Sequence, residues 1–206
     1  MDPVRLEVWS DYLCPWCYVA AHRLARVQAE FGEDALALRW RSYLLRPRPA
    51  PRDRDVFVRY TRSWERPAAE PDAPRFRVWE GDEGPPTHSV PPHAAAKAAA
   101  RLGPAAFRAL HGRLLRAYFA ESRDITRTET LRALWADCGL DPAAGEAASD
   151  GELVAEVQAD HAAALERGIT GVPAVAVAGR EGWVLGAQPL AIYRRWVERL
   201  RAEEGA

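Results

Sequence analysis

The stretch Asp11-Tyr-Leu-Cys-Pro-Trp-Cys-Tyr-Val-Ala20 contains two of the three cysteines in a chain of 206 residues. Residues 4–9, just before it, alternate apolar and polar side chains, which is typical of a strand with one buried face. After the stretch, apolar residues recur at helical spacing as far as Phe31, and Gly32 is a suitable residue to end the helix. The cysteine pair therefore lies where a predicted strand gives way to a predicted helix.

The same alternation returns over residues 35–45 and predicts a second strand. A strand, a helix and a strand in this order form a unit whose right-handed crossover leaves the two strands parallel. Near the other end of the chain, residues 174–178 and 183–185 are two short apolar segments separated by glycines, and a last helix is predicted from Pro189. The sequence therefore places α/β elements at both ends of the chain.

The middle of the chain has a different composition. Residues 46–92 hold ten of the 16 prolines and lack a sustained apolar period, which predicts a long ordered loop with at most a short helix over residues 56–64. Residues 93–167 show helical periodicity, and Gly103-Pro104 separates two helices there. Two more helices are predicted to start at sequences with capping-box spacing and to end at glycines: Thr126-Arg-Thr-Glu129 to Gly139, and Ser149-Asp-Gly-Glu152 to Gly168.

Taken in order, these elements predict the α/β fold class with a discontinuous domain. Residues 1–45 and 169–206 would together form one α/β domain. Residues 46–168, which comprise the proline-rich loop and the helices, would form a large all-helical insertion between the second and third strands.

Composition and charge narrow the classes of function. The chain is 48% hydrophobic and 28% charged, as ordinary globular proteins are, and its formal net charge is -1. It therefore offers no overall positive field to nucleic acid or to an anionic membrane. The N-terminus has no basic region followed by an apolar one, and no apolar run is long enough to span a bilayer. We predict a cytoplasmic protein with neither a nucleic-acid nor a membrane partner.

The cysteine pair has the spacing of a redox couple. Cys14 is predicted at the very start of the helix, where Pro15 is tolerated and where free N–H groups and the helix dipole stabilise a thiolate. The pKa of Cys14 should therefore lie below the value of about 8.5 of a free cysteine. Cys17 lies one turn later on the same face and closer to the core, within disulfide distance of Cys14. Cys14 is thus the candidate nucleophile and Cys17 the candidate resolving thiol.

Other uses of the pair fit the sequence less well. Structural zinc usually takes four cysteine or histidine ligands, and no second closely spaced pair is present. A c-type haem attachment needs histidine directly after the second cysteine, where Tyr18 stands. A cysteine–histidine hydrolase would have no use for Cys17. Redox chemistry is favoured, with metal binding and simple packing as the alternatives.

The sequence resembles the thioredoxin superfamily, and within it the DsbA-like proteins, especially their FrnE-like cytoplasmic branch. Three segments carry the resemblance: Ser10-Asp-Tyr-Leu-Cys-Pro-Trp-Cys-Tyr18, Gly168-Ile-Thr-Gly-Val-Pro-Ala174 and Gly186-Ala-Gln188. The resemblance implies a thioredoxin fold with the helical insertion described above. It also implies a cis bond between Val172 and Pro173, packed beside the cysteines, with the backbone before it able to pair with an extended substrate. Residues 46–92 show little of the family pattern, which leaves the choice of substrate open.

The resemblance and the cysteine pair together predict a thiol–disulfide oxidoreductase. It would act through a mixed disulfide with protein or small thiol substrates and would need no cofactor beyond its own dithiol, with glutathione as a candidate co-substrate. One rival function is a glutathione-dependent isomerase or transferase of the 2-hydroxychromene-2-carboxylate isomerase or kappa class. Those relatives typically carry serine and no second cysteine at the corresponding turn, so Cys17 argues against them. The other rival is a chaperone-like module that binds client proteins without catalysis.

Several residues near the pair have two interpretations each. Trp16 is either an apolar contact for the substrate or a packing residue, and it replaces the histidine of strongly oxidising DsbA-type pairs, which favours a less oxidising disulfide. Asp11 is either a proton-transfer group or a local cap. Cys138, at the end of a predicted helix, is interpreted as a small buried hydrophobic residue. Surface or core roles are predicted for four histidines, among which His93 is singled out because similar proteins often carry a histidine early in this helix: His22, His93, His111 and His161.

Overall fold

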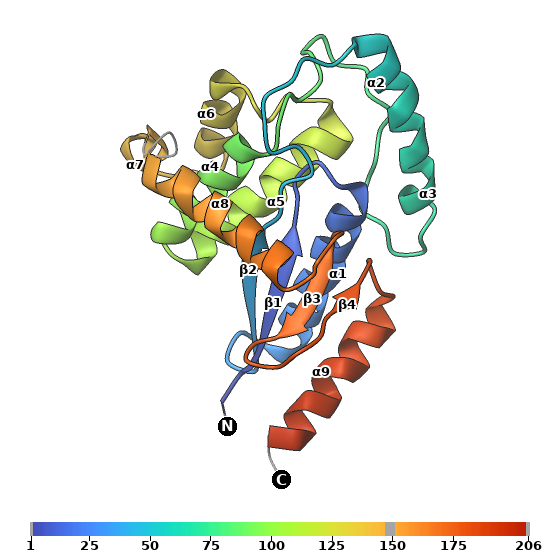
Figure 1. Ribbon diagram of the computed structural model, residues 1–206, viewed down its shortest axis with the longest axis vertical. Coiled ribbons are helices and arrows are strands. Elements are labelled where there is room, and N and C mark those ends of the chain that lie inside the picture. Colours follow the sequence, from blue (N-terminus) through green and yellow to red (C-terminus); the bar gives the residue numbers. More distant parts are fainter. Residues whose placement is uncertain (1, 147–150, 205–206) are drawn as a thin grey trace.

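The computed structural model describes residues 2–146 and 151–204, and in that part of the chain one sheet has the strand order β2-β1-β3-β4 (Figure 1). Its strands are β1 (Val4–Ser10), β2 (Leu36–Ser42), β3 (Ala174–Val177) and β4 (Val184–Leu185). β1 runs parallel to β2, from Val4 opposite Leu36 to Ser10 opposite Ser42, and antiparallel to β3. The first strand of the chain is therefore in the middle of the sheet, between partners far apart in the sequence.

Helices cover both faces of this sheet. They are α1 (Pro15–Phe31), α2 (Arg54–Thr61), α3 (Glu65–Ala68), α4 (Val90–Arg101), α5 (Pro104–Glu121), α6 (Thr128–Asp137), α7 (Pro142–Glu146), α8 (Gly151–Glu166) and α9 (Leu190–Glu204), with a short 3-10 helix, η1 (Arg62–Trp64), before α3. Leu24 of α1 and Val197 of α9 pack with Val8 of β1 on one face. Trp9 faces the other side, where it packs with Ala164 of α8. Alternate residues of β1 thus enter two different cores.

The order of elements agrees with the order predicted from the sequence. The bounds of α1 match the prediction at both ends, because Pro15 suits a first helical turn and Gly32 takes a positive φ of 85° just after the helix. All helices from α2 to α8 lie between β2 and β3, so the predicted insertion is present. The division into domains at residues 45 and 168 remains a prediction.

The helices of the insertion differ from the prediction in detail. Residues 46–92 contain α2, η1 and α3 in place of one short helix, and α4 begins at Val90 because prolines are tolerated in a first turn. The capping box predicted at Thr126 is wrong, since α6 begins at Thr128 and the Thr126 hydroxyl donates to Asp124 at 2.7 Å. The helix α7 was not predicted. The second predicted box, which includes Ser149, lies outside the described residues.

Aromatic packing explains the order of residues 46–92. Phe57, Trp64 and Trp79 from this segment are each 1% exposed, and they pack against Tyr118 and Phe119 of α5. Three buried large aromatic side chains remove several hundred Å² of apolar surface from water. The proline-rich segment is therefore held on α5 by its own aromatic side chains. This packing could not be predicted from the sequence, because the segment has no helical period.

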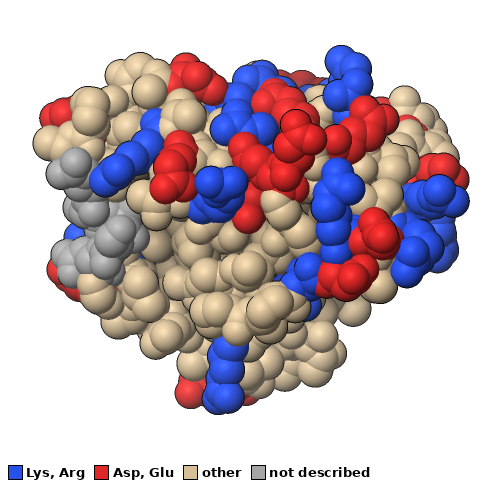
Figure 2. All heavy atoms as spheres, turned by 90° about the horizontal axis from the view of Figure 1, so that it is seen from above, with Lys and Arg blue, Asp and Glu red and all other residues tan. Residues whose placement is uncertain are grey.

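The surface seen from above carries acidic and basic side chains close together, with a broad area beside them that carries neither (Figure 2). Charges of both signs are thus interspersed on this face, and they give it no extended field of one sign. No helix within residues 2–146 and 151–204 combines the length and the apolar character needed to cross a lipid bilayer.

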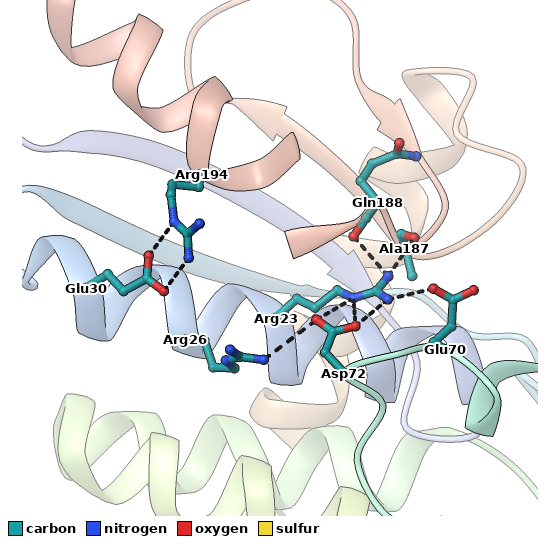
Figure 3. A network of polar contacts seen from close by, with 8 residues as sticks. All are labelled: Arg23, Arg26, Glu30, Glu70, Asp72, Ala187, Gln188 and Arg194. Atoms are coloured by element: carbon teal, nitrogen blue, oxygen red, sulfur yellow. Dashed lines mark hydrogen bonds and ion pairs between the residues drawn. The ribbon is translucent and has the colours of Figure 1, made fainter. Parts of the chain in front are cut away.

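A buried arginine of α1 connects three parts of the chain (Figure 3). The guanidinium of Arg23, with its side chain 1% exposed, donates to both carboxylate oxygens of Asp72 and to Glu70, the shortest contacts being 2.6 Å. It also donates to the main-chain carbonyls of Ala187 and Gln188 at 3.1 and 3.0 Å. Arg23 therefore ties α1 to the segment after α3 and to the connection between β4 and α9.

Candidate active site

The cysteine pair lies where β1 leads into α1. Cys14 has an extended backbone and occupies the N-cap position of α1, and Pro15 is the first helical residue. Cys14 is 6% exposed and Cys17, one turn into the helix, is 0% exposed. Both are free thiols in the structure, and Pro15 and Trp16 between them are half-buried. Of the two residues, only Cys14 has any exposure to solvent, so a substrate can approach it and not Cys17.

The two thiols have opposite electrostatic environments. The Cys17 thiol donates a hydrogen bond to the Cys14 sulfur, and this bond lowers the pKa of Cys14 below its ordinary value. The N–H groups of Cys17 and Trp16 also lower it, whereas burial and the charge of Asp11 raise it. Burial, followed by the neighbouring Cys14, raises the pKa of Cys17 well above its ordinary value. Cys14 is therefore the thiol of the pair that ionises more readily, and Cys17 is the thiol that stabilises the ionised form. From the sequence, only the start of the helix was expected to lower the pKa of Cys14. The contribution of the Cys17 thiol was not predicted.

The loop before β3 brings Val172 and Pro173 to the pair. The peptide bond between them is cis, as the family resemblance implied. The Val172 carbonyl oxygen lies 3.5 Å from the Cys14 sulfur, and the Pro173 carbonyl accepts a hydrogen bond from the N–H of Gly186 at 2.8 Å. Val172 is half-buried, so part of this residue is exposed beside Cys14. The predicted role of both residues in binding substrate stays a prediction.

Asp11 is a buried carboxylate below the cysteine pair. It accepts hydrogen bonds from the N–H of Leu13 at 2.8 Å, from the N–H of Leu45 at 2.6 Å and from the Ser89 hydroxyl at 2.7 Å. Its own N–H points to the Cys17 sulfur at 3.5 Å. Asp11 is thus more than the local cap predicted as one alternative, because it also joins the end of β2 and the start of α4 to the cysteine turn. Neither Leu45 nor Ser89 was predicted as a hydrogen-bond partner of Asp11.

The burial of Asp11 has an expected effect on stability. Burial raises the pKa of this carboxyl from 3.8 to about 6, against its three hydrogen bonds. The unfolded chain therefore loses this proton at a lower pH than the folded protein does, and the contribution of Asp11 to stability decreases as the pH rises from about 4 to about 6. The difference in free energy of unfolding between the wild type and Asp11→Ala should therefore decrease by about 2 kcal/mol from pH 4 to pH 6. Urea unfolding of both proteins at several pH values measures this, and an advantage that grows with pH would contradict it.

Two buried histidines stand close to Tyr12, next to the pair in sequence. The Tyr12 hydroxyl and Nδ1 of His111 are 2.8 Å apart, and the His93 ring centroid lies 4.8 Å from that of Tyr12. Burial lowers the pKa of both histidines to about 3, so both are neutral at physiological pH. They line a cavity of about 320 Å³ together with Tyr12, Trp40 and Ser10. Their spacing in the sequence does not indicate that they meet, because they come from two different helices.

The remaining residues singled out from the sequence lie elsewhere. Cys138 follows α6 and packs, half-buried, against the aromatic cluster of the insertion, where burial raises its pKa. Nδ1 of His161 accepts a hydrogen bond from the N–H of Leu44 at 3.2 Å. His22 is half-buried on α1, and burial lowers its pKa. None of these three was predicted to take part in the chemistry, and no hydrogen bond between them and the cysteine pair is present among the described residues.

Tyr60 of α2 was not expected at the site. Its side chain is 45% exposed, and burial of the hydroxyl together with the negative charge of Cys14 raises its pKa. The hydroxyl therefore lies within electrostatic reach of the Cys14 sulfur. Since Tyr60 belongs to residues 46–92, where no family pattern was found, no signal in the sequence pointed to it.

The chain matches known proteins along most of its length. The family described as a DSBA-like thioredoxin domain matches residues 5–196. No curated protein matches the chain. Among solved structures, it is similar to the cytosolic disulfide reductase DsbM from Pseudomonas aeruginosa with GSH, at 24% identity and a TM-score of 0.77, covering 98% of this chain and 100% of that one.

Two other solved structures are similar as well. A probable DsbA oxidoreductase from Streptomyces coelicolor is 28% identical, with a TM-score of 0.74, and the match covers 97% of this chain and 91% of that one. A 2-hydroxychromene-2-carboxylate isomerase is 19% identical, with a TM-score of 0.69, and the match covers 98% of both chains. The same fold thus carries both disulfide chemistry and an isomerase in other proteins.

Proposed function

This chain belongs to the family of DSBA-like thioredoxin domains, and from this we propose that it is a thiol–disulfide oxidoreductase that works through Cys14 and Cys17. The thioredoxin fold with a helical insertion, which the sequence resemblance implied, is confirmed by this membership and by the sheet described above. One observation above all supports the proposal. The pKa of Cys14 is lowered while that of its partner Cys17 is raised, which is the asymmetry that an attacking and a resolving thiol require.

The proposed reaction has two exchange steps. The Cys14 thiolate attacks one sulfur of a substrate disulfide, the substrate S–S bond breaks, and the departing thiolate takes up a proton. Cys17 then loses its proton and attacks the Cys14 sulfur of the mixed disulfide, so that the second substrate thiol leaves. The substrate gains two electrons and two protons, and the enzyme keeps a Cys14–Cys17 disulfide. Two molecules of a small thiol such as glutathione return the pair to the dithiol: the first forms a mixed disulfide with Cys14, and the second attacks it and leaves as glutathione disulfide.

We propose reduction as the direction of this reaction. The Cys17 hydrogen bond stabilises the thiolate of the reduced pair, but Trp16 supplies no positive charge beside it, which favours a disulfide of modest oxidising power. A cytoplasmic location, predicted from the sequence, would keep the pair mostly reduced. The similarity to a cytosolic disulfide reductase solved with GSH supports glutathione as the reductant and protein disulfides or glutathione disulfides as substrates.

A second candidate function is a glutathione-dependent isomerisation. The similarity to 2-hydroxychromene-2-carboxylate isomerase supports it, as does the cavity beside Tyr12 and the two histidines. In this case glutathione would act at Cys14 without net oxidation, and Cys17 would not need to form a disulfide. The hydrogen bond from Cys17 to Cys14 favours the redox function over this one.

The test compares disulfide reduction by the wild type and by the double variant Cys14→Ser/Cys17→Ser. With glutathione in excess and the produced glutathione disulfide removed by glutathione reductase, we expect the wild type to reduce insulin or a glutathione mixed disulfide and the double variant to stay at the uncatalysed rate. Turnover of a chromene carboxylate, with no disulfide reduction, would favour the isomerase instead. Binding of unfolded clients that survives in the double variant, without either activity, would favour the chaperone-like alternative.

A further inference from the structure

Arg52 lies on an aromatic support next to the candidate active site. Its guanidinium carbon is 4.3 Å from the ring centroid of Phe57 and 5.7 Å from that of Tyr60. Phe57 is 1% exposed, so the ring below Arg52 is fixed in the aromatic cluster of the insertion. A guanidinium stacked in this way keeps its charge and presents its N–H edge for a planar anion. The support thus restricts the position of Arg52 before any ligand arrives.

The charge of Arg52 has no carboxylate partner among residues 2–146 and 151–204, because no ion pair within 4.0 Å includes it there. Its neighbours are used differently: Arg46 donates to the carbonyls of Thr87 and Ala50, and Arg54 donates to the carbonyl of Gly81. Those two arginines hold the backbone of the segment. Arg52 is positioned by ring stacking and its charge remains unpaired by an acidic group.

Tyr60 connects Arg52 to the reacting sulfur. The charges of Cys14 and of Arg52 act on the Tyr60 hydroxyl in opposite directions, the first raising and the second lowering its pKa. Leu13, which precedes Cys14, belongs to the same buried cluster as Phe57, so the two sites share one packed core. Figure 1 shows α3, which follows α2 and η1 in the chain, beside α1, and the two helices are in contact. The Tyr60 hydroxyl is thus within electrostatic reach of both the stacked arginine and the nucleophile.

The surrounding segment has a strong local charge. Residues 46–62 contain six arginines against two aspartates, whereas the whole chain carries a formal charge of -1. An anionic substrate approaching Cys14 from this side would be attracted, and the attraction would weaken with salt. A tripeptide thiol with terminal carboxylates places an anionic group roughly 7 Å from its sulfur, or two residues of extended chain. Such a molecule has the charge that this arginine-rich segment attracts.

We propose that Arg52, stacked on Phe57 and Tyr60, binds a carboxylate of a small acidic thiol of the glutathione type while its sulfur exchanges at Cys14. The inference rests on the proposed disulfide chemistry and adds to it the residue that selects an acidic thiol. Arg52 would then lower the KM for acidic thiols with little effect on the rate of the sulfur chemistry itself. Neutral thiols would gain nothing from it.

The test measures kcat and KM for three reductants of the same disulfide: glutathione, its diethyl ester and dithiothreitol. For the wild type we expect a KM for glutathione about tenfold below that for the ester, and a difference that shrinks as salt is added. In Arg52→Met the KM for glutathione should rise about tenfold, while kcat and the KM for neutral dithiothreitol stay within about twofold and the KM for the ester, which carries only an ammonium charge, does not rise. Arg59→Met is the matched control and should change nothing, because Arg59 is exposed on α2 and forms no ion pair with a carboxylate within residues 2–146 and 151–204.

Three results would overturn the proposal. They are a wild type with no preference for glutathione over its ester, an equal rise of KM for all three thiols in Arg52→Met, and an unchanged KM for glutathione in that variant. If Arg52→Met proves unstable, two other measurements test the proposal. Arg52→Gln should raise the KM for glutathione in the same way, and the preference of the wild type for glutathione should shrink as salt is added. A wild type that turns over none of the three thiols would instead contradict the disulfide chemistry itself, so the two failures are distinguishable.

Discussion

Replacing Cys14 by serine is expected to reduce disulfide exchange by at least about a thousandfold, because a serine hydroxyl forms no nucleophilic anion at neutral pH. Replacing Cys17 has a different expected result. Cys17→Ser keeps the attacking sulfur but loses the resolving one, so the reaction should stop at the mixed disulfide on Cys14. Part of the stabilisation of the Cys14 thiolate should also be lost, since the Cys17 thiol donates to it.

Mass spectrometry of each variant after mixing with a disulfide substrate, without a small thiol, measures these outcomes. Cys17→Ser should accumulate one substrate half per chain, whereas Cys14→Ser should accumulate none. Titration of the remaining thiolate by its absorbance near 240 nm should give a higher pKa for Cys14 in Cys17→Ser than in the wild type. Cys138→Ser, which removes the third cysteine away from the pair, is the control. Equal trapping by both variants would show that the order of attack and resolution is wrong.

Arg23→Met is expected to be strongly destabilising. The arginine is buried, and its removal leaves Asp72, Glu70 and two main-chain carbonyls without their donor (Figure 3). Methionine fills a similar volume but forms no hydrogen bond. Because both carboxylates keep some contact with water, we expect a loss of about 3 kcal/mol in free energy of unfolding, or about 6–12 °C in Tm.

Arg26→Met is the matched control for this substitution. Arg26 lies on the same helix and also contacts Asp72, but at 3.8 Å and with its side chain 45% exposed. Its loss should cost no more than about 0.5 kcal/mol. Thermal unfolding followed by circular dichroism compares the two variants with the wild type. Equal changes in Tm for both would mean that the buried network of Arg23 contributes no more than an exposed ion pair.

The cysteine turn could be predicted from the sequence because its signals are local. Pro15 and Gly32 mark the ends of α1 by their own backbone preferences, and the spacing of Cys14 and Cys17 sets their geometry within one helical turn. The role of Cys17 as a donor to Cys14 depends on side-chain contacts, and it therefore became visible only in the structure.

Residues 46–92 could not be predicted well, for a physical reason. Their order depends on rings such as Trp64 and Trp79 packing on α5, about forty residues or more along the chain, and no local period records such contacts. The partners of Asp11 at Leu45 and Ser89 are equally remote in sequence. The same is true of Arg52, whose significance lies in the rings beneath it and in the lack of any ion pair within 4.0 Å in the described chain.

The position of β1 in the middle of the sheet also matters during synthesis of the chain. β1 leaves the ribosome first, but its partner β3 follows only after more than 160 further residues, at Ala174–Val177. At 5–20 residues per second, this is a delay of roughly 10–30 s, in which one edge of β1 is unpaired. The Val172 carbonyl that lies beside Cys14 arrives equally late. The cysteines are thus made well before the loop that completes their surroundings.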